Sequence, residues 1–286
     1  MLKSVPCNLF PVTYFYYFCV SNHKNMNYAL VTGGSSGIGF AYASVLAEKG
    51  YNILIVSNQE EENEKSATQL REKFGVDVRT LFADLAHEDS AQQLFDFCQR
   101  EGIQVDVLVN NAGMYYFDLI TQQPLAKTAA MVQLNMTTPT LLCALFGAEM
   151  KKRGTGYILN ASSITAWMEF PGLAVYGNSK RYLKGFSRSL ASEFNDFGVK
   201  VCAVCPGAVD TSLYNLSPEV RRRCRRWGVM LSPEAVARKG GKALFKGRVI
   251  CVPGRINYLF LFFVKLMPHW FVNFLKRKLK LFTKNA

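Results

Sequence analysis

A strand, a glycine-rich turn and the start of a helix are predicted by the stretch Tyr28-Ala29-Leu30-Val31-Thr32-Gly33-Gly34-Ser35-Ser36-Gly37-Ile38-Gly39, with a helix-like run at 40–49. Such a turn presents backbone N–H groups and the positive end of the helix dipole, which suits a pyrophosphate group. Gly33 permits the tight turn, Gly37 lets the backbone approach the phosphates, and Gly39 allows the helix to pack closely on the strand. The spacing G-x-x-x-G-x-G differs from the general dinucleotide motif G-x-G-x-x-G.

Apolar runs of strand length alternate with amphipathic segments through the centre of the chain. The strand-like runs are 52–56, 78–82, 105–109, 157–160, 199–204 and 249–252. This alternation is typical of a parallel sheet covered by helices on both faces. A chain of 286 residues with 49% hydrophobic content can bury one sizeable core. The sequence therefore predicts an α/β fold with a single doubly wound parallel sheet of the Rossmann type.

Tyr176 and Lys180 share a predicted helix, and Ser163 stands thirteen residues before the tyrosine. A phenol normally titrates near 10, so proton exchange with a substrate near neutral pH needs a nearby cation to stabilise the phenolate. The i, i+4 spacing puts the two side chains on one helical face. Because tyrosine and lysine also meet at this spacing by chance, the pair gains meaning only beside the other motifs.

Five motifs together resemble the short-chain dehydrogenase/reductase family, over about 27–252. They are Thr32-Gly33-x-x-x-Gly37-x-Gly39, Asn110-Asn111-Ala112-Gly113, Ser163, Tyr176-x-x-x-Lys180 and Pro206-Gly207. The resemblance implies an NAD(P)(H)-dependent oxidoreductase, in which nicotinamide carries the hydride and Tyr176 exchanges the proton with the carbonyl oxygen. It also implies that Lys180 assists Tyr176 and holds the nicotinamide ribose, and that Ser163 bonds the substrate oxygen. Asn135 matches the position that holds a proton-relaying water, and homo-oligomers are common in the family.

The cofactor-binding residues implied by the resemblance bear on the choice of nucleotide. They are Gly33, Ser35, Ser36, Gly37, Ile38, Gly39, Asn58, Asp84, Leu85, Asn111, Ala112, Gly113, Tyr176, Lys180, Pro206, Gly207 and Thr211. A site for NAD usually carries an acid after the second strand, whereas a site for NADP supplies positive charge. This chain has Ser57-Asn58-Gln59 there, with neither an acid nor an arginine. We expect NADP(H), with NAD(H) as the alternative.

Large apolar and aromatic residues fill three loops that are expected at the carboxyl ends of the strands, where open α/β sheets bind ligands. They lie at 114–117, 166–171 and 213–214. Such a lining favours a lipophilic ketone, alcohol or aldehyde, and the chain is most similar to family members with a hydrophobic C-terminal tail that handle lipid-like or steroid-like carbonyl compounds. Two alternatives stay open. One is a soluble 3-ketoacyl-thioester reductase whose arginines at 221–226 bind a carrier protein or coenzyme A, and the other is a non-catalytic dinucleotide-binding interaction protein.

Positive charge is concentrated in the last quarter of the chain, although the whole chain has a net charge of +13. From Arg221 onward there are 17 Lys or Arg and one acid, so the remaining 17 basic and 20 acidic residues give the first 220 positions −3. An apolar run at 256–264 is too short to span a bilayer. With the aromatic and basic residues at 270–280, it predicts an interfacial segment at an anionic membrane. The alternative is a tail that packs over the substrate cleft or in a dimer contact; no nucleic-acid module is recognised.

The cysteines indicate a compartment, and the ends of the chain indicate its organisation. Most of the eight cysteines fall in predicted core elements, which is typical of buried thiols in a protein of a reducing compartment. We therefore expect a cytoplasmic protein, and the interfacial segment predicted above would place it peripherally on the cytoplasmic face of a membrane. Cys202 and Cys205 form a CxxC without a second ligand pair, and the three histidines are isolated, so no metal site is predicted.

Residues 1–26 are expected to be an extension, with Met26 as the physiological start. The catalytic domain is expected at 27–254 and the hydrophobic, basic tail at 255–286.

Overall fold

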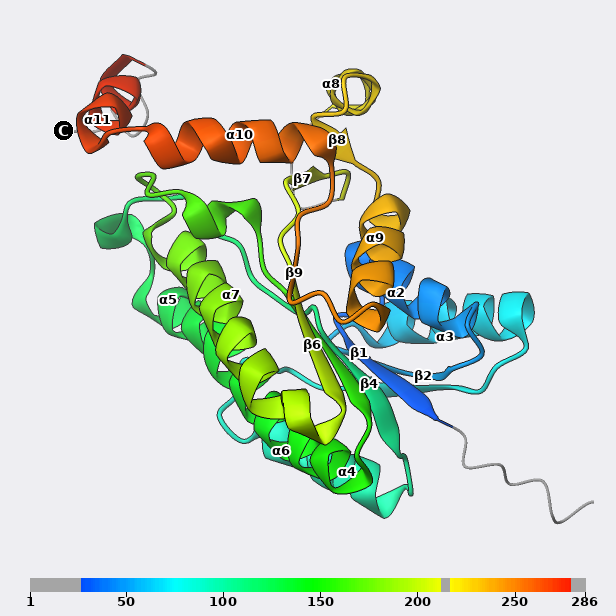
Figure 1. Ribbon diagram of the computed structural model, residues 1–286. Helices are drawn as coiled ribbons and strands as arrows, with labels where there is room; N and C mark the ends of the chain where they lie inside the picture. The colour runs from blue at the N-terminus through cyan, green and yellow to red at the C-terminus, as the bar shows by residue number, and fades with distance from the viewer. Residues whose placement is uncertain (1–26, 212–216, 279–286) are drawn as a thin grey trace, which may run out of the picture.

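Seven parallel strands form one sheet in the order β3-β2-β1-β4-β5-β6-β9 (Figure 1). This computed structural model describes residues 27–211 and 217–278, so the predicted extension at 1–26 lies outside the described residues. The strands are β1 (Tyr28–Thr32), β2 (Asn52–Ser57), β3 (Val78–Phe82), β4 (Val105–Asn110), β5 (Gly156–Ala161), β6 (Val199–Val204) and β9 (Ile250–Cys251). Each neighbouring pair runs parallel. The strand order reverses at β1, and open α/β sheets bind ligands at such a switch point. The predicted doubly wound α/β fold is confirmed.

Helices cover both faces of the sheet. One face carries α2 (Gly37–Ala47), α3 (Glu60–Phe74) and α9 (Pro233–Phe245), and the other carries α4 (Ser90–Arg100), α6 (Thr138–Arg153) and α7 (Ala174–Phe194). Successive residues of a strand point to opposite faces. Ala29 and Val31 accordingly belong to the first core, whereas Tyr28 and Leu30 belong to the second. Because both faces are buried, these strands read as continuous apolar runs in the sequence.

One helical run among the described residues, Leu125–Arg153, is long and apolar enough to cross a membrane by length and composition. It consists of α5 (Leu125–Val132), a π-helical turn η2 (Gln133–Thr137) and α6. Leu142, Phe146 and Met150 of this run are buried in the core beneath the sheet. In this fold the side of α6 that carries these residues packs in the core.

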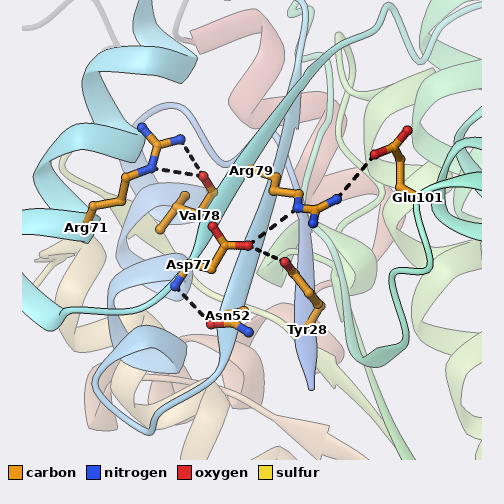
Figure 2. A network of polar contacts seen from close by, with 7 residues as sticks. All are labelled: Tyr28, Asn52, Arg71, Asp77, Val78, Arg79 and Glu101. Carbon is orange, nitrogen blue, oxygen red and sulfur yellow. Dashed lines mark hydrogen bonds and ion pairs between the residues drawn. The ribbon is translucent and has the colours of Figure 1, made fainter. Parts of the chain in front are cut away.

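A polar network ties together the amino ends of the strands β1, β2 and β3 (Figure 2). The Tyr28 hydroxyl donates a hydrogen bond to the carboxylate of Asp77. The backbone N–H of Asp77 donates to Asn52 Oδ1 at 2.9 Å. Arg79 Nε donates to the same carboxylate at 3.4 Å. Burial, reinforced by Asp77, raises the pKa of Tyr28 to about 12, so the phenol keeps its proton. Because Tyr28 and Asn52 begin their strands, these bonds fix the strand register at the end of the sheet opposite to the ligand-binding edge.

The chain after β6 builds a separate cover at the carboxyl ends of the strands. Two short strands, β7 (Ala208–Val209) and β8 (Met230–Leu231), pair on either side of α8 (Pro218–Arg226). After β9 come α10 (Arg255–Leu266) and α11 (His269–Lys278), and α10 crosses one end of the sheet (Figure 1). Leu261 of α10 is 7% exposed and shares a small core with Ile164 and Ala203. The predicted tail therefore packs on the domain along one side.

Candidate active site

Two adjoining cavities lie where the strands end. The large cleft has a volume of about 630 Å³ and is lined by the glycine-rich turn and by the residues that follow β2, β3 and β4. The small cavity has a volume of about 130 Å³ and is lined by residues that follow β4, β5 and β6 and by α7. Ile38, Asn111, Gly113, Met114 and Thr211 line both. The two cavities therefore form one continuous site.

The glycine-rich turn borders the large cleft, as the spacing predicts. Gly33 and Gly37 have φ of +63° and +54°, a backbone conformation that favours glycine. Both line the cleft together with Ser35, Ser36 and Ile38. Gly39 does not line it: a Cβ there would lie 1.9 Å from the Gly33 carbonyl oxygen. Gly39 thus serves the close packing of α2 on the turn, as the spacing predicts, and its place among the cofactor-binding residues stays a prediction.

Thr32 joins the ends of β1 and β4, a role that the sequence analysis did not assign. Its Oγ1 accepts hydrogen bonds from the N–H groups of Asn111 and Ala112, both at 3.0 Å. The Asn111 side chain returns a bond from Nδ2 to the Thr32 carbonyl at 3.1 Å. These bonds fix the floor of the large cleft, where Asn111, Ala112 and Gly113 were expected. A hydroxyl residue directly before the first glycine of the turn was the available signal.

The residues after β2 differ in how they are engaged. Ser57 Oγ donates to Asn63 Oδ1 at 2.6 Å and accepts from the Gln59 N–H at 3.2 Å, so this hydroxyl is bonded within the protein. Asn58 is exposed and lines the large cleft. The three consecutive glutamates that follow lie in the first turn of α3 and do not line the cleft. Asp84 and Leu85, after β3, line it as expected.

Ser163, Tyr176 and Lys180 all line the small cavity. Lys180 Nζ lies 5.8 Å from the centroid of the Tyr176 ring and donates a hydrogen bond to the Ala161 carbonyl at 3.0 Å. The Tyr176 ring packs edge-on against Tyr115, with centroids 4.8 Å apart. Burial lowers the pKa of Lys180 from 10.5 to about 8, while the neighbouring Cys205 acts in the opposite direction. A cation that titrates near neutral pH therefore stands beside the phenol.

The two consecutive serines after β5 have different partners. Ser162 Oγ donates to the Lys180 carbonyl at 2.7 Å, which ties α7 to the end of the strand. Ser163 begins a 3₁₀ turn, η3 (Ile164–Trp167), and its Oγ accepts from the Thr165 N–H at 3.2 Å. A hydroxyl that only accepts keeps its own proton for another acceptor. Of the two, Ser163 is better suited to donate a hydrogen bond into the cavity.

Asn135 lies behind the site rather than in it. It is 1% exposed, sits in the π-helical turn η2 and lines neither cavity. Its Nδ2 donates to the Met114 carbonyl and its Oδ1 accepts from the Met114 N–H, both at 2.9 Å. A Cβ at Gly113 would lie 3.2 Å from both Asn135 Oδ1 and Lys180 Nζ. Asn135 thus fixes the loop at Met114, and Gly113 of this loop lies close to both the Asn135 amide and the Lys180 ammonium.

Pro206 and Gly207 line the small cavity and not the large cleft, while Thr211 lines both. A Cβ at Gly207 would lie 2.5 Å from Oδ1 of Asn257, a buried residue of α10. The C-terminal helix thus rests directly on the wall of the site. Sequence reasoning missed Asn257, although an asparagine inside an apolar helix was a visible signal. The predicted loop at 213–214 lies outside the described residues.

The CxxC pair is buried in the described part of the chain. Cys202 and Cys205 are both 0% exposed, and burial raises the pKa of Cys205 to about 12. Within 27–211 and 217–278, no three His, Cys, Asp or Glu side chains are grouped so that they could hold a metal ion. These thiols pack as small apolar groups.

Comparisons with known proteins bear on the whole site. A family model described as short chain dehydrogenase matches residues 27–220. The very-long-chain 3-oxoacyl-CoA reductase of Mus musculus is 30% identical over 212 residues, which cover 70% of this chain and 66% of the mouse protein.

Two solved structures are similar over most of their length. The bulky-bulky ketone specific alcohol dehydrogenase from Comamonas testosteroni has a TM-score of 0.70 and 25% identity, covering 92% of this chain and 96% of that one. A short-chain dehydrogenase from Sphingobium yanoikuyae in complex with NADPH has a TM-score of 0.70 and 26% identity, covering 79% and 87%. The family match, the sheet order and the glycine-rich turn agree, and the chain belongs to the short chain dehydrogenase family of oxidoreductases, which act on alcohol and carbonyl groups with a nicotinamide dinucleotide.

Proposed function

We propose that this protein is an NADP(H)-dependent reductase of lipophilic ketones or aldehydes. The observation that carries the proposal is the lining of the small cavity, in which Ser163, Tyr176 and Lys180 meet beside the large cleft. A non-catalytic role is disfavoured because a phenol, a cation and a hydroxyl donor all line one cavity. Residues 27–254 form the catalytic unit in this proposal, and 255–286 form its hydrophobic, basic tail, in which α10 and α11 cover one end of the sheet.

The large cleft fits a dinucleotide. Backbone N–H groups at the start of α2 suit the pyrophosphate, and the positive φ at Gly33 and Gly37 keeps the approach open. The residues proposed to hold the cofactor are Gly33, Ser35, Ser36, Gly37, Ile38, Asn58, Asp84, Leu85, Asn111, Ala112, Gly113, Tyr176, Lys180, Pro206, Gly207 and Thr211, with Gly39 packed behind the turn. When bound there, nicotinamide supplies the hydride.

The residues of the chain supply the proton and hold the substrate. Tyr176 donates its hydroxyl proton to the carbonyl oxygen in reduction and takes it back in alcohol oxidation. Lys180 stabilises the phenolate that remains, since an ammonium near the ring favours the charged form. Ser163 donates a hydrogen bond to the same substrate oxygen and fixes it within reach of Tyr176. Asn135 holds the loop at Met114, and a water held near it would relay protons to the lysine.

NADP(H) is the preferred nucleotide in this proposal. Asn58, at the end of β2, lines the cleft with a neutral side chain, so no acid there repels a 2′-phosphate. The complex of the Sphingobium relative with NADPH supports the same choice. NAD(H) remains the alternative, because no arginine stands at this position.

The substrate is proposed to be lipophilic because Met114 and Tyr115 line the small cavity. The names of the Comamonas and mouse relatives, a bulky-ketone dehydrogenase and a 3-oxoacyl-CoA reductase, support a large apolar carbonyl compound. A second candidate is a 3-oxoacyl thioester carried on coenzyme A or a carrier protein. Arg221 and Arg225 of α8 pair with Asp210 at 3.6 and 3.2 Å, next to the cleft residue Thr211. The remaining arginines of α8, at 222, 223 and 226, are exposed and suit an anionic carrier.

Hydride transfer on a panel of carbonyl compounds tests these candidates. The purified protein is assayed with NADPH and with NADH on neutral aliphatic ketones, on 3-oxoacyl-CoA thioesters and on a sugar. We expect turnover with NADPH on the neutral ketones. Turnover confined to the thioesters, and lost when Arg222, Arg223 and Arg226 are changed to Gln, supports the second candidate. No turnover with any compound, in a protein that binds NADPH, supports a binding role instead.

The outer face of the C-terminal helices is proposed to dock on an anionic membrane. Exposed apolar side chains gather along α10 and α11: Tyr258, Leu259, Phe262, Phe263, Leu266, Trp270 and Phe274. Arg277 and Lys278 stand exposed at the end of the same surface. Apolar and aromatic side chains beside basic ones are the composition of an interfacial helix. The protein would then lie peripherally on the cytoplasmic face, as a homo-oligomer in keeping with its family.

A further inference from the structure

A third cavity lies between the segment that follows Ser163 and the two C-terminal helices. Its volume is about 330 Å³. Trp167, Met168 and Phe170 form one wall, and Phe260, Val264 and Met267 form the other. It shares no lining residue with the small cavity or the large cleft. We call it the tail cavity.

The lining of the tail cavity suits a hydrocarbon. Its volume falls in the range of small-ligand sites, which are mostly apolar with a few polar groups. Two lining residues are titratable, Glu169 and His269, and both are exposed to solvent. Glu169 pairs with Arg181 at 3.3 Å, so its charge is compensated by the guanidinium. The Trp167 ring is held by the Lys184 ammonium, 3.9 Å from its centroid. The titratable groups of the lining therefore lie at its solvent-exposed rim, and the six apolar and aromatic side chains of the two walls offer contact to a hydrocarbon.

Helix α10 runs from the catalytic site to the tail cavity. Asn257 packs against Gly207, which lines the small cavity. Phe260 and Val264 follow on the same side of the helix at the positions i+3 and i+7, and they line the tail cavity. At 1.5 Å per residue, Asn257 and Val264 are about 10 Å apart along the axis. The opposite wall of the tail cavity also starts at the catalytic site. The turn η3 begins directly after Ser163, which lines the small cavity, and ends at Trp167, which lines the tail cavity.

We propose that the tail cavity accepts the distal hydrocarbon chain of the substrate and selects its length. The inference rests on the proposed reduction of lipophilic carbonyl compounds. The proposed substrate carries a carbonyl group near one end and a flexible hydrocarbon chain that extends along α10, past Trp167. Short ketones would occupy the small cavity alone and would gain nothing from the tail cavity.

The kinetic test fills the tail cavity and compares ketones of increasing chain length. Val264→Trp places a large side chain in the cavity, and Leu259→Trp places the same side chain on the exposed outer face of α10. For the wild type we expect kcat/KM to rise from 2-butanone to 2-dodecanone. Val264→Trp should lower the long-chain value at least tenfold and leave the short-chain value unchanged, while Leu259→Trp changes neither. Equal loss on both ketones, or no loss on the long one, would overturn the proposal.

A binding test does not depend on catalysis. The fluorescent fatty acid cis-parinaric acid is titrated into the wild type, the two tryptophan variants and Tyr176→Phe. We expect Val264→Trp alone to weaken binding at least tenfold. Probe binding that depends on Val264, without turnover of any carbonyl compound, would keep the site and reject the proposed function. If the enzyme turns over carbonyl compounds but Val264→Trp does not change probe binding, the tail cavity is rejected as the chain-binding site and the proposed reductase function is kept. Met267→Trp serves as the second filling variant if Val264→Trp unfolds at a lower temperature than the wild type.

Discussion

Lys180 Nζ lies 5.8 Å from the centre of the Tyr176 ring, while its hydrogen bond goes to the backbone carbonyl of Ala161. In the described part of the chain no carboxylate pairs with this ammonium. A carbonyl orients the ammonium without cancelling its charge. The field of the cation is therefore directed at the phenol, and the cost of that arrangement is a buried charge.

Replacing Tyr176 with Phe removes the proton donor and keeps the ring that packs on Tyr115. We expect kcat to fall at least about 100-fold, since general acid catalysis contributes roughly that much or more. NADPH affinity, measured by fluorescence titration, should stay close to that of the wild type. A variant with wild-type turnover would remove Tyr176 from the mechanism.

Replacing Lys180 with Met should abolish turnover and raise stability at neutral pH. Burial lowers the pKa of Lys180 from 10.5 to about 8, so below pH 8 the folded state carries the full penalty of a desolvated ammonium. At 1.36 kcal/mol per pKa unit this penalty is on the order of 3 kcal/mol. Methionine removes this penalty but leaves the Ala161 carbonyl without its hydrogen-bond donor, which offsets part of the gain in stability. We therefore expect the free energy of unfolding at pH 7 to rise by about 1–3 kcal/mol.

The pH dependence provides the control for this prediction. Between pH 8 and 10.5 the unfolded chain binds the lysine proton and the folded chain does not, so the stability of the wild type rises with pH across this window. The advantage of Lys180→Met should therefore shrink from pH 7 to pH 10 in urea unfolding. Equal advantages at both values would mean that the charge of Lys180 is not the cause.

Much of this architecture could be predicted from the sequence, because burial on both faces of the sheet leaves an unmistakable pattern of apolar runs. The expected strands agree with the structure within one residue at each end. The helix-like run expected at 40–49 corresponds to α2, which begins three residues earlier, at Gly37. Glycine has low helix propensity, but the first turn of a helix needs no intrahelical N–H bonds, so two glycines are tolerated there.

What the sequence could not provide were contacts between elements that are distant along the chain. Motif spacing predicted which residues belong to the site. It did not predict that the Asn135 side-chain amide is hydrogen-bonded to the backbone of Met114, or that Ser57 is hydrogen-bonded to Asn63. The position of the tail was equally hidden. An apolar helix with basic neighbours is compatible with a membrane surface or with packing, and here one side packs while the other remains exposed.

Asn58 should control the choice of nucleotide. Asn58→Arg should raise the ratio of kcat/KM for NADPH over NADH roughly tenfold or more, since a hydrogen bond to a charged group contributes about 1.5–3 kcal/mol. Asn58→Asp should shift the ratio toward NADH by repelling the phosphate. Glu62→Gln, in the first turn of α3 and outside the cleft lining, is the control and should leave the ratio unchanged. If neither change at 58 alters the ratio, Asn58 does not face the ribose.

Gly207 and Asn257 should be energetically coupled. In Gly207→Ala the new Cβ would lie 2.5–2.9 Å from three atoms of the Asn257 side chain, so we expect a loss of about 1–3 kcal/mol in stability. Asn257→Ala in the same chain makes room and should recover part of that loss, which a double-mutant cycle measures. Gly185→Ala, with open space around its Cβ, is the matched control. Additive effects of the two changes would show that α10 does not rest on the wall of the site.

The outer face of the C-terminal helices should bind anionic vesicles. Deleting the tail is an unsuitable test because Asn257 and Leu261 are buried against the domain, so substitution of outer residues is preferable. Trp270 and Phe274 are 69% and 48% exposed, and changing both to Ser should reduce co-sedimentation with phosphatidylserine vesicles. Binding of the wild type should also fall with added salt, because screening at 0.15 M ionic strength limits exposed charges to about 8 Å.

Two further variants separate the apolar from the electrostatic contribution to this binding. Arg277→Glu with Lys278→Glu should weaken binding to anionic vesicles and leave the weak binding to neutral phosphatidylcholine unchanged, since each basic residue near the surface contributes about 1 kcal/mol. Leu125→Ser removes a side chain that is 86% exposed at the start of α5, which is not part of the C-terminal helices, and should have no effect. Equal sedimentation of the wild type and the Trp270/Phe274 variant on anionic vesicles would reject the membrane surface. The exposed face of α10 and α11 would then be better explained as a contact between copies of the chain, which the oligomeric state of the two proteins in light scattering would reveal.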